Sequence, residues 1–443
     1  MESKLNMADL NRNKESSSPV GITGSDENSI ADVKKSRLLV DSRIEGINGA
    51  VASISNFSEI RNVEREIDVE AKFYYNISTR SYTTAHLNGG SAAATNSQAV
   101  LQTSTSTNGR SFVRTRKTVD YRVSQDIEFS HTLLFPSLSG TPGSQVGFTN
   151  STQHVGVIDR SNQNGIYIGF NNNETFSIFY RKDGVETKIN QSSFSHDKLD
   201  ASTITNGKVS EYAPDWTKIQ LVRCVFSWHG ASPFIFQIEK PNGEWLTYHV
   251  ESFVNSRTTP SIANPIMSLF AEIKNTGNAT NLSLVWQAGQ ASFLGKSNPL
   301  SGSRFFSVES INIVQAQTPV LTIRSRDLFA SKTNFILSSL DYLSLNSDGN
   351  KFVTFRLYKN ATLVGSSFTN IDTNNSVVEF DTSSTSFSGG EFLLTIRTQS
   401  VGSFNQLVKD LNIQLEPLDT LTVTAQSQSS NDVNVGFRWR EFH

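Results

Sequence analysis

The chain contains a single cysteine, Cys224, and this scarcity excludes an intrachain disulfide framework. The fold must therefore be held together by packing alone. Cys224 lies in a dense apolar alternation, and free cysteines are among the most buried residue types, so we predict a buried side chain without a nucleophilic role. Long apolar runs are also absent, since no stretch reaches the roughly 18 residues of a membrane span, and the first residues lack the apolar segment of a signal peptide. We expect no membrane partner.

Charge is equally sparse, with 18% charged residues and a formal net charge of −2. The chain has no basic stripe with interleaved aromatic residues, so we expect no nucleic-acid partner. A Walker loop, a His-Glu-x-x-His helix, a cysteine pair and EF-hand spacing are all missing. The seven histidines are scattered singly, which argues against a histidine metal site. We therefore predict no catalytic residue, no cofactor and no metal.

A glycoside hydrolase on a sandwich fold would need two carboxylates placed about 5–10 Å apart. The acidic residues of the central region show no paired E-x-D-x-E type pattern on one strand: Asp126, Glu128, Asp159, Glu239 and Glu244. Glu239 and Glu244 flank an Asn242-Gly243 turn and are interpreted as solvated turn residues. His131 alternates with apolar residues from Ile127 to Phe135 and is interpreted as a polar member of that strand, because no partner triad is visible.

The organising stretch of the chain runs from Lys218 to Glu251. Its first strand carries apolar residues on both faces, which predicts that both faces are covered. Asn242-Gly243 then predicts a hairpin with positive φ at both residues, and Asp183-Gly184 predicts a second hairpin. Together these signals predict an antiparallel meander at the centre of a β-sandwich.

Abundant Ser, Thr and Asn, together with 29 phenylalanines, favour an all-β protein of two or three domains. We predict an extended N-terminal arm at residues 1–42, and a linker at 43–110 with the first strands. A central jelly-roll or lectin-like β-sandwich is predicted at 111–316, with a smaller C-terminal β-sandwich at 317–443. The C-terminal sandwich is predicted because strand patterns recur every 8–12 residues beyond Gln315.

The arm is too poor in apolar residues to order itself, so its sparse apolar side chains are predicted to dock on another protein: Val20, Ile22, Ile30, Val33, Leu38, Leu39 and Val40. A second stripe has near-helical spacing: Ile44, Ile47, Val51, Ile54 and Phe57. This stripe is either a short oligomerising helix, which would favour a trimer over a dimer, or an irregular linker broken by Gly46 and Gly49.

Several stretches resemble structural virion proteins of tailed phages and other large DNA viruses, a group that includes neck, collar, head-fibre and tail-associated proteins. The matching segments are PVGITGSDENSIADVKKSRLLVD in the arm, RTRKTVDYRVSQDIEFSHTLLF, GIYIGFNNNETFSIFYR, WHGASPFIFQIEKPNGEWLTYHV with its continuation to residue 284, and the C-terminal residues 418–442. They cover roughly half of the chain. The resemblance implies a fold and membership of the virion, and it carries no catalytic residues.

We therefore expect a non-enzymatic structural virion protein, localised in the virion, that docks through its arm onto capsid, portal or neck proteins and forms a homo-oligomer. The alternative is a host-glycan-binding, lectin-like module that binds sugars through exposed Trp or Tyr side chains. A polysaccharide depolymerase is a third hypothesis.

Overall fold

The computed structural model describes residues 33–34, 37–38, 53–54, 60–61, 65–119, 125–201, 204–205, 208–227, 232–294, 302–313, 315–334, 336, 338–349, 351–398, 402–411 and 413–441. The protein is all-β, as predicted. In this part of the chain the only helical turns are two short 3-10 segments, Gln191–Ser193 and Lys409–Leu411. None of its helices has the length and hydropathy needed to span a bilayer. Two β-sandwiches are present, and each is described by itself.

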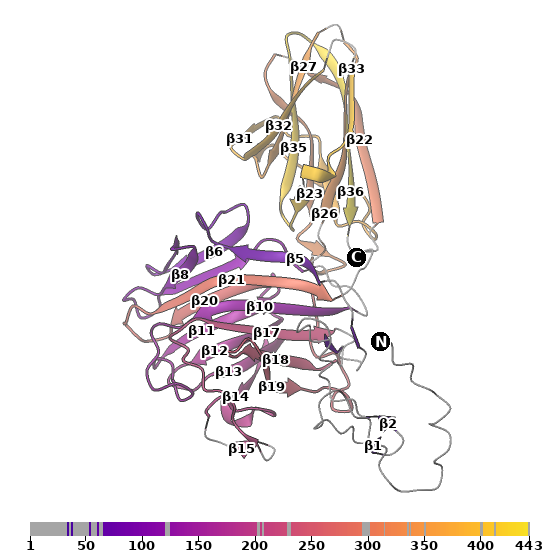
Figure 1. The fold of residues 1–443 in the computed structure, drawn as a ribbon. Coiled ribbons are helices and arrows are strands. Elements are labelled where there is room, and N and C mark those ends of the chain that lie inside the picture. Colours follow the sequence, from indigo (N-terminus) through magenta and orange to yellow (C-terminus); the bar gives the residue numbers. More distant parts are fainter. Residues whose placement is uncertain are drawn as a thin grey trace, which may run out of the picture. The chain divides into compact units, whose positions relative to one another are not determined.

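The first sandwich contains an eight-stranded antiparallel sheet (Figure 1). Its strand order is β19 (Trp245–Glu251), β18 (Phe234–Glu239), β17 (Gln220–Ser227), β10 (Asp126–Leu134), β21 (Ser283–Leu294), β8 (Gln98–Gln102) and β7 (Ser91–Thr95). The long strand β21 pairs with β8 near its start and with β5 (Arg65–Lys72) over its second part.

Opposite it lies a seven-stranded antiparallel sheet. The order is β14 (Val185–Asn190), β13 (Ser177–Lys182), β12 (Gly165–Asn171), β11 (Ser151–Ile158), β20 (Ser268–Asn275), β9 (Arg110–Thr115) and β6 (Tyr82–Leu87). The stretch between β14 and β17 includes a small hairpin of β15 (Ile204–Thr205) and β16 (Lys208–Val209).

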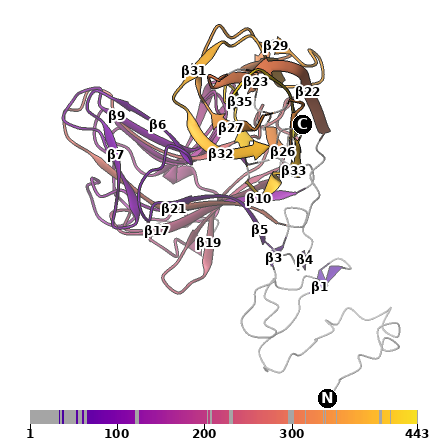
Figure 2. The ribbon, with the colours of Figure 1, turned by 90° about the horizontal axis from the view of Figure 1, so that it is seen from above.

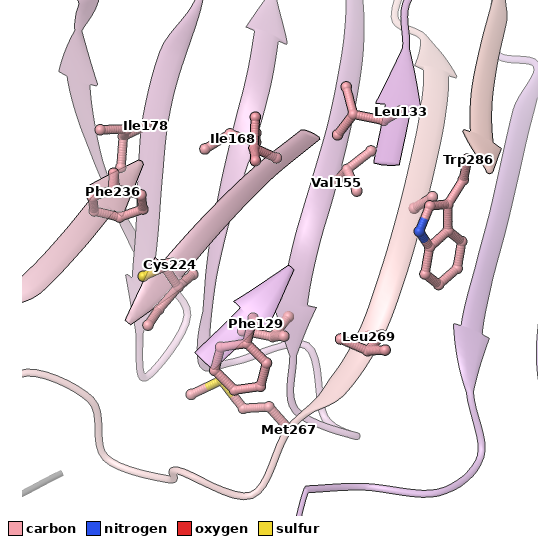
Figure 3. Close-up of a cluster of buried hydrophobic side chains, with 14 of the residues drawn as sticks. Phe129, Leu133, Val155, Ile168, Ile178, Cys224, Phe236, Met267, Leu269 and Trp286 are labelled. Atoms are coloured by element: carbon pink, nitrogen blue, oxygen red, sulfur yellow. The ribbon is translucent and has the colours of Figure 1, made fainter. Parts of the chain in front are cut away.

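The core of the first sandwich lies between its two sheets, because the strands alternate inward apolar and outward polar side chains. Figure 3 shows Phe129, Cys224 and Phe236 from one sheet facing Ile168 and Leu269 from the other. Cys224 is buried, as predicted, and burial raises the pKa of its thiol. Its environment therefore holds it in the unreactive thiol form.

Two glycine turns set the hairpins of this sandwich. Asp183 and Gly184 have φ values of 48° and 80°, and the flanking residues pair, so the predicted turn between β13 and β14 is confirmed. The hairpin between β18 and β19 is also confirmed, but its predicted turn type is wrong. Only Gly243 has positive φ (83°), because Pro241 fixes an ordinary turn and Gly243 follows it as the left-handed bulge residue.

The prediction that β17 is covered on both faces is also wrong. Its inward residues are buried, whereas Leu221, Arg223 and Val225 point the other way and are half-exposed. Apolar side chains on that outer face gain partial cover from their cross-strand neighbours, since Val225 lies between Glu128 and Ile235. The part of the outer face that β17 contributes is therefore partly open to solvent.

The second sandwich has its own hydrophobic core. One sheet runs β22 (Gly302–Ile313), β36 (Asn431–Glu441), β26 (Ser338–Ser347) and β33 (Gly402–Leu407), with β34 (Gln414–Leu415) also on β26. The other runs β29 (Thr369–Asn370), β30 (Val378–Asp381), β23 (Thr318–Ser325), β35 (Thr420–Ser427), β27 (Val353–Lys359) and β32 (Glu391–Thr398). The central sandwich predicted at residues 111–316 would include Phe305–Ile313, but β22 pairs along its length with β36 and belongs to the second sandwich.

Four further short strands complete the described elements of the second sandwich and its loops. The first two form a hairpin, β24 (Leu328–Phe329) with β25 (Lys332–Thr333), and β28 (Thr362–Val364) pairs with β31 (Ser386–Ser388). Gly389 and Gly390 have φ values of 61° and 84°, which fits the tight turn between β31 and β32.

Most of the predicted docking and oligomerisation residues lie outside the described residues. Within residues 1–63 the structure describes two small hairpins, β1 (Val33–Lys34) with β2 (Arg37–Leu38), and β3 (Ser53–Ile54) with β4 (Ile60–Arg61). Val33 and Leu38 of the arm pair with each other, and Ile54 of the stripe lies in a strand. Both the docking and the oligomer assignments stay predictions.

Candidate functional site

A row of polar side chains crosses the outer face of the eight-stranded sheet. The strand registers align one polar residue on each of six neighbouring strands: Thr247 on β19, Gln237 on β18, Arg223 on β17, Ser130 on β10, Gln290 on β21 and Glu70 on β5. We call these six residues the polar ladder. All six are at least partly exposed. Because neighbouring strands lie about 4.8 Å apart, the ladder is roughly 24 Å long.

Hydrogen bonds fix the first three rungs of the polar ladder. Arg223 Nε donates to Gln237 Oε1 over 2.7 Å, and Gln237 Nε2 donates to Thr247 Oγ1 over 2.8 Å. These bonds orient each amide and guanidinium group on a rigid strand before any ligand arrives. A binding site built this way loses little conformational entropy when it is occupied.

A nearly buried carboxylate anchors the centre of this face. The side chain of Glu128 on β10 is 4% exposed and accepts hydrogen bonds from Arg223 Nη1 at 3.1 Å and from Arg65 Nη2 at 3.0 Å. Burial lowers the pKa of Arg223, and the negative charge of Glu128 opposes that change. Two guanidinium groups therefore share one carboxylate, which fixes the position of Arg223 in the ladder.

Trp245 lies at one end of the polar ladder. Its indole ring is half-exposed, and the guanidinium carbon of Arg223 lies 3.9 Å from the ring centroid. Such cation–π stacking orients the ring and leaves part of it accessible. The site thus combines an aromatic surface with hydrogen-bonding groups on a flat, open sheet face.

The other described tryptophans cannot contact a ligand, because Trp216, Trp286 and Trp439 are each at most 1% exposed. Among the described tyrosines, Tyr74 and Tyr75 are the exposed ones, at 70% and 96%, and they follow β5 outside the polar ladder. The sequence indicated exposed Trp or Tyr side chains for the glycan-binding alternative but did not identify which ones they are. The only local signals of this site were an arginine within an apolar strand and a tryptophan after a hairpin turn.

The outer face of the seven-stranded sheet carries a different, more closed arrangement. Five buried apolar side chains gather there: Phe112, Ile158, Tyr167, Phe179 and Phe270. The guanidinium groups of Arg110 and Arg181 lie over the rings of Phe112 and Tyr167, with distances to the centroids of 5.3 and 5.7 Å. The charged side chains cover these rings, so the aromatic surface is not open to a ligand.

Ion pairs complete this charged cover. Arg110 pairs with Glu272, and Glu186 accepts hydrogen bonds from Arg181 Nη2, at 2.9 Å, and from the Tyr167 hydroxyl. Burial alone would raise the pKa of Glu186, but those two hydrogen bonds lower it below its usual value. Glu186 therefore stays ionised, which is the opposite of what a general acid needs.

Two of the carboxylates named from the sequence, Asp159 and Glu244, form hydrogen bonds or ion pairs that stabilise local structure. Asp159 is fully buried and accepts hydrogen bonds from neutral donors, Gln163 N and Asn164 Nδ2, both at 2.9 Å. Glu244 forms an ion pair with Lys240 at 2.8 Å in the hairpin turn, which fits its interpretation as a turn residue. His131 is 4% exposed and points inward from β10.

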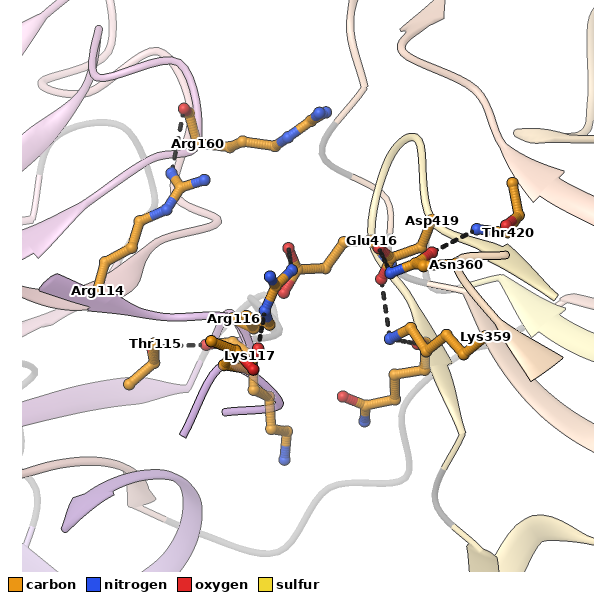
Figure 4. A network of polar contacts seen from close by, with 12 residues as sticks. Arg114, Thr115, Arg116, Lys117, Arg160, Lys359, Asn360, Glu416, Asp419 and Thr420 are labelled. Atoms are coloured by element: carbon orange, nitrogen blue, oxygen red, sulfur yellow. Dashed lines mark hydrogen bonds and ion pairs between the residues drawn. The ribbon is translucent and has the colours of Figure 1, made fainter. Parts of the chain in front are cut away.

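Among the residues drawn in Figure 4, Lys359, Asn360, Asp419 and Thr420 form a polar network of the second sandwich. Asp419 accepts from Lys359 Nζ at 2.9 Å and from Asn360 Nδ2 at 2.8 Å, and Thr420 N donates to Asn360 Oδ1 at 2.9 Å. These contacts join the end of β27 to the start of β35. Across the residues that the structure describes, no cluster of three or more His, Cys, Asp or Glu side chains could hold a metal ion.

No protein-family model and no curated protein sequence matches the chain. Solved structures similar to part of it include the CBM2 module of an evolved Dit from Lactobacillus casei BL23 phage J-1, with a TM-score of 0.34 and 10% identity over 53% of this chain and 99% of that one. Peanut lectin has a TM-score of 0.32 and 8% identity over 53% and 100%. The legume lectin-like domain from Entamoeba histolytica has a TM-score of 0.29 and 11% identity over 48% and 89%.

Proposed function

We propose that the first sandwich is a carbohydrate-binding module that holds a linear glycan along the polar ladder. The observation that carries this proposal is the alignment of six polar side chains across six strands with a half-exposed tryptophan at one end. This corresponds to the alternative drawn from the sequence, a host-glycan-binding, lectin-like module.

The chemistry of the ladder matches that of a sugar chain. Hydroxyl groups both donate and accept hydrogen bonds, and amide, hydroxyl and guanidinium side chains supply complementary partners. The strand spacing of about 4.8 Å repeats these partners at intervals comparable to the length of one sugar unit in an extended chain. The indole of Trp245 offers an apolar face on which the C–H face of a sugar ring can stack.

The module binds without catalysis in this proposal. Glu128, the most central carboxylate of the face, is 4% exposed and held between two arginines, so it is not accessible to a bound glycan. Glu70 reaches solvent next to Lys72 at the far end of the ladder. Incubation with a bound polysaccharide should therefore release no reducing ends, and any such release would contradict this part of the proposal.

The test is a glycan array probed with the full chain and with Trp245→Ala. Binding should be found for linear glycans and should fall at least tenfold for the variant, because the stacking surface is lost. Tyr75→Ala is a matched control, since it removes an aromatic ring that is 96% exposed but lies off the ladder. Equal loss in both variants, or an array without any ligand, would overturn the proposal.

We also propose that this module belongs to a virion, where residues 1–42 attach it to capsid, portal or neck proteins. The support is the sequence resemblance to structural virion proteins, which spans roughly half of the chain and includes the arm. Deletion of residues 1–42 should leave a folded, glycan-binding protein that no longer joins particles. Normal incorporation of the truncated chain would refute the attachment role without affecting the glycan proposal.

A further inference from the structure

One end of the first sandwich is built from a segment without charged residues. Between Arg80 and Arg110 the chain contains no Asp, Glu, Lys or Arg, although 18% of the whole chain is charged and several would be expected in a stretch of this length. This segment forms β6, β7 and β8, and so supplies one terminal strand to each sheet. Figure 2 shows β7 at one end of the sandwich.

The terminal strand β7 has an open edge. Among the described strands it pairs only with β8, through the register Ser91 to Gln102, Ala93 to Val100 and Thr95 to Gln98. The two-residue turn Asn96-Ser97 has positive φ at both residues (53° and 62°), so the hairpin closes on a hydrogen-bonded pair. Because bonded and non-bonded pairs alternate, the N–H and C=O groups of Ala92 and Ala94 point away from β8.

Open edges of this kind usually carry protection against pairing with another chain. The opposite edge strand of the same sheet, β19, has a bulge opposite Phe236–Gln237 and ends on Glu251. The edge strand β14 of the other sheet carries Glu186 and Lys188. β7 has neither charge, proline nor bulge, and its sequence is Ser-Ala-Ala-Ala-Thr.

We propose that β7 is a docking edge for a second copy of this chain, which pairs antiparallel with it about a twofold axis that passes midway between the two copies of Ala93. In that register Ala93 faces its own copy, Ala92 faces Ala94, and Ser91 faces Thr95. The outward N–H and C=O groups of Ala92 and Ala94 then bond to each other across the axis. Two sheets join into one continuous sheet.

The absence of charge is what favours a second copy over a different partner. In a twofold contact each residue near the axis meets its own copy, so any charge there would face a like charge. An uncharged edge is therefore complementary to itself. The side chains suit close pairing as well, because Ser91, Ala93 and Thr95 are small and exposed, while Ala92 and Ala94 pack on the core and continue its surface to the edge.

The experiment measures the mass of the full chain by sedimentation equilibrium as a function of concentration. The wild type should be a dimer, and Ala93→Lys should raise the dissociation constant at least about tenfold, since two ammonium groups would face each other across the axis. Ala93→Glu should do the same. An equimolar mixture of the two variants should restore the dimer, because the introduced ammonium group of one copy then faces the introduced carboxylate of the other.

Two further variants test the edge hydrogen bonds and control for the added charge. Ala94→Pro removes an outward N–H while leaving the bonds to β8 intact, so it should also dissociate the dimer without unfolding the sandwich. Val185→Lys adds the same charge on the edge strand β14, at a residue 71% exposed, and should leave the dimer unchanged. A monomeric wild type, or a dimer or trimer that resists both Ala93→Lys and Ala94→Pro, would overturn the proposal.

Discussion

Replacement of His131 by leucine should make the first sandwich less sensitive to acid. His131 is 4% exposed, neither of its ring nitrogens has a hydrogen-bond partner, and its ring lies 5.9 Å from that of Trp286. Burial lowers the pKa of His131 from 6.5 to about 3. At a pH between these two pKa values, His131 is therefore protonated in the unfolded chain and neutral in the folded chain.

The sign and size of the effect follow from this difference. The stability linked to His131 is fully present above about pH 6.5 and is lost progressively as the pH falls toward 3. At about pH 4.5, two pH units below the unfolded pKa, the loss is about 2.7 kcal/mol. His131→Leu cannot bind the proton in either state, so the free energy of unfolding of the variant should fall by about 2.7 kcal/mol less on acidification.

Urea unfolding at about pH 7 and about pH 4.5, followed by tryptophan fluorescence, measures this difference. The signal reports mainly on the first sandwich, because only Trp439 lies in the second. Other titrating groups contribute equally to both proteins and cancel in the comparison. His196→Leu, at an exposed histidine, is the control and should keep the wild-type pH dependence. The same acid sensitivity in wild type and His131→Leu would refute the reasoning.

Two more predictions concern single residues of the same sandwich. Gly169→Ala should destabilise the first sandwich by about 3 kcal/mol or more. The φ of Gly169 is 152°, and an added Cβ would lie 1.8 Å from the carbonyl oxygen of Gln153. A thermal melt that shows near-wild-type stability for the variant would contradict this prediction. Glu128→Gln should lower the free energy of unfolding by about 2–4 kcal/mol, because Arg223 and Arg65 lose the carboxylate that they share. Urea unfolding should show this loss for Glu128→Gln and not for the exposed control Glu244→Gln.

Local patterns were enough to predict the all-β class, the hairpins and the burial of Cys224. Alternation with period two and glycine turns are properties of a few neighbouring residues, and Asp183-Gly184 shows how directly they fix backbone geometry. The turn at Asn242-Gly243 was predicted with the wrong geometry, because Pro241 just before it also restricts the backbone.

The candidate site could not be predicted in the same way. The six residues of the polar ladder are spread along the sequence from Glu70 to Gln290, and only the pairing of six strands aligns them. A shift of one residue in any register would turn that strand's rung to the other face. The same applies to β22, whose alternation identified a strand but whose partner, β36, lies more than a hundred residues away.

The affinity for oligosaccharides of increasing length tests the polar ladder most directly. Once an array has identified a linear glycan, calorimetric titration of its fragments should show affinity that rises with each added sugar unit and levels off when the chain spans the six rungs, a length of roughly 24 Å. In Gln237→Ala/Gln290→Ala the gain per unit should be reduced. Full affinity already reached with a mono- or disaccharide would mean a compact pocket elsewhere and would contradict the account.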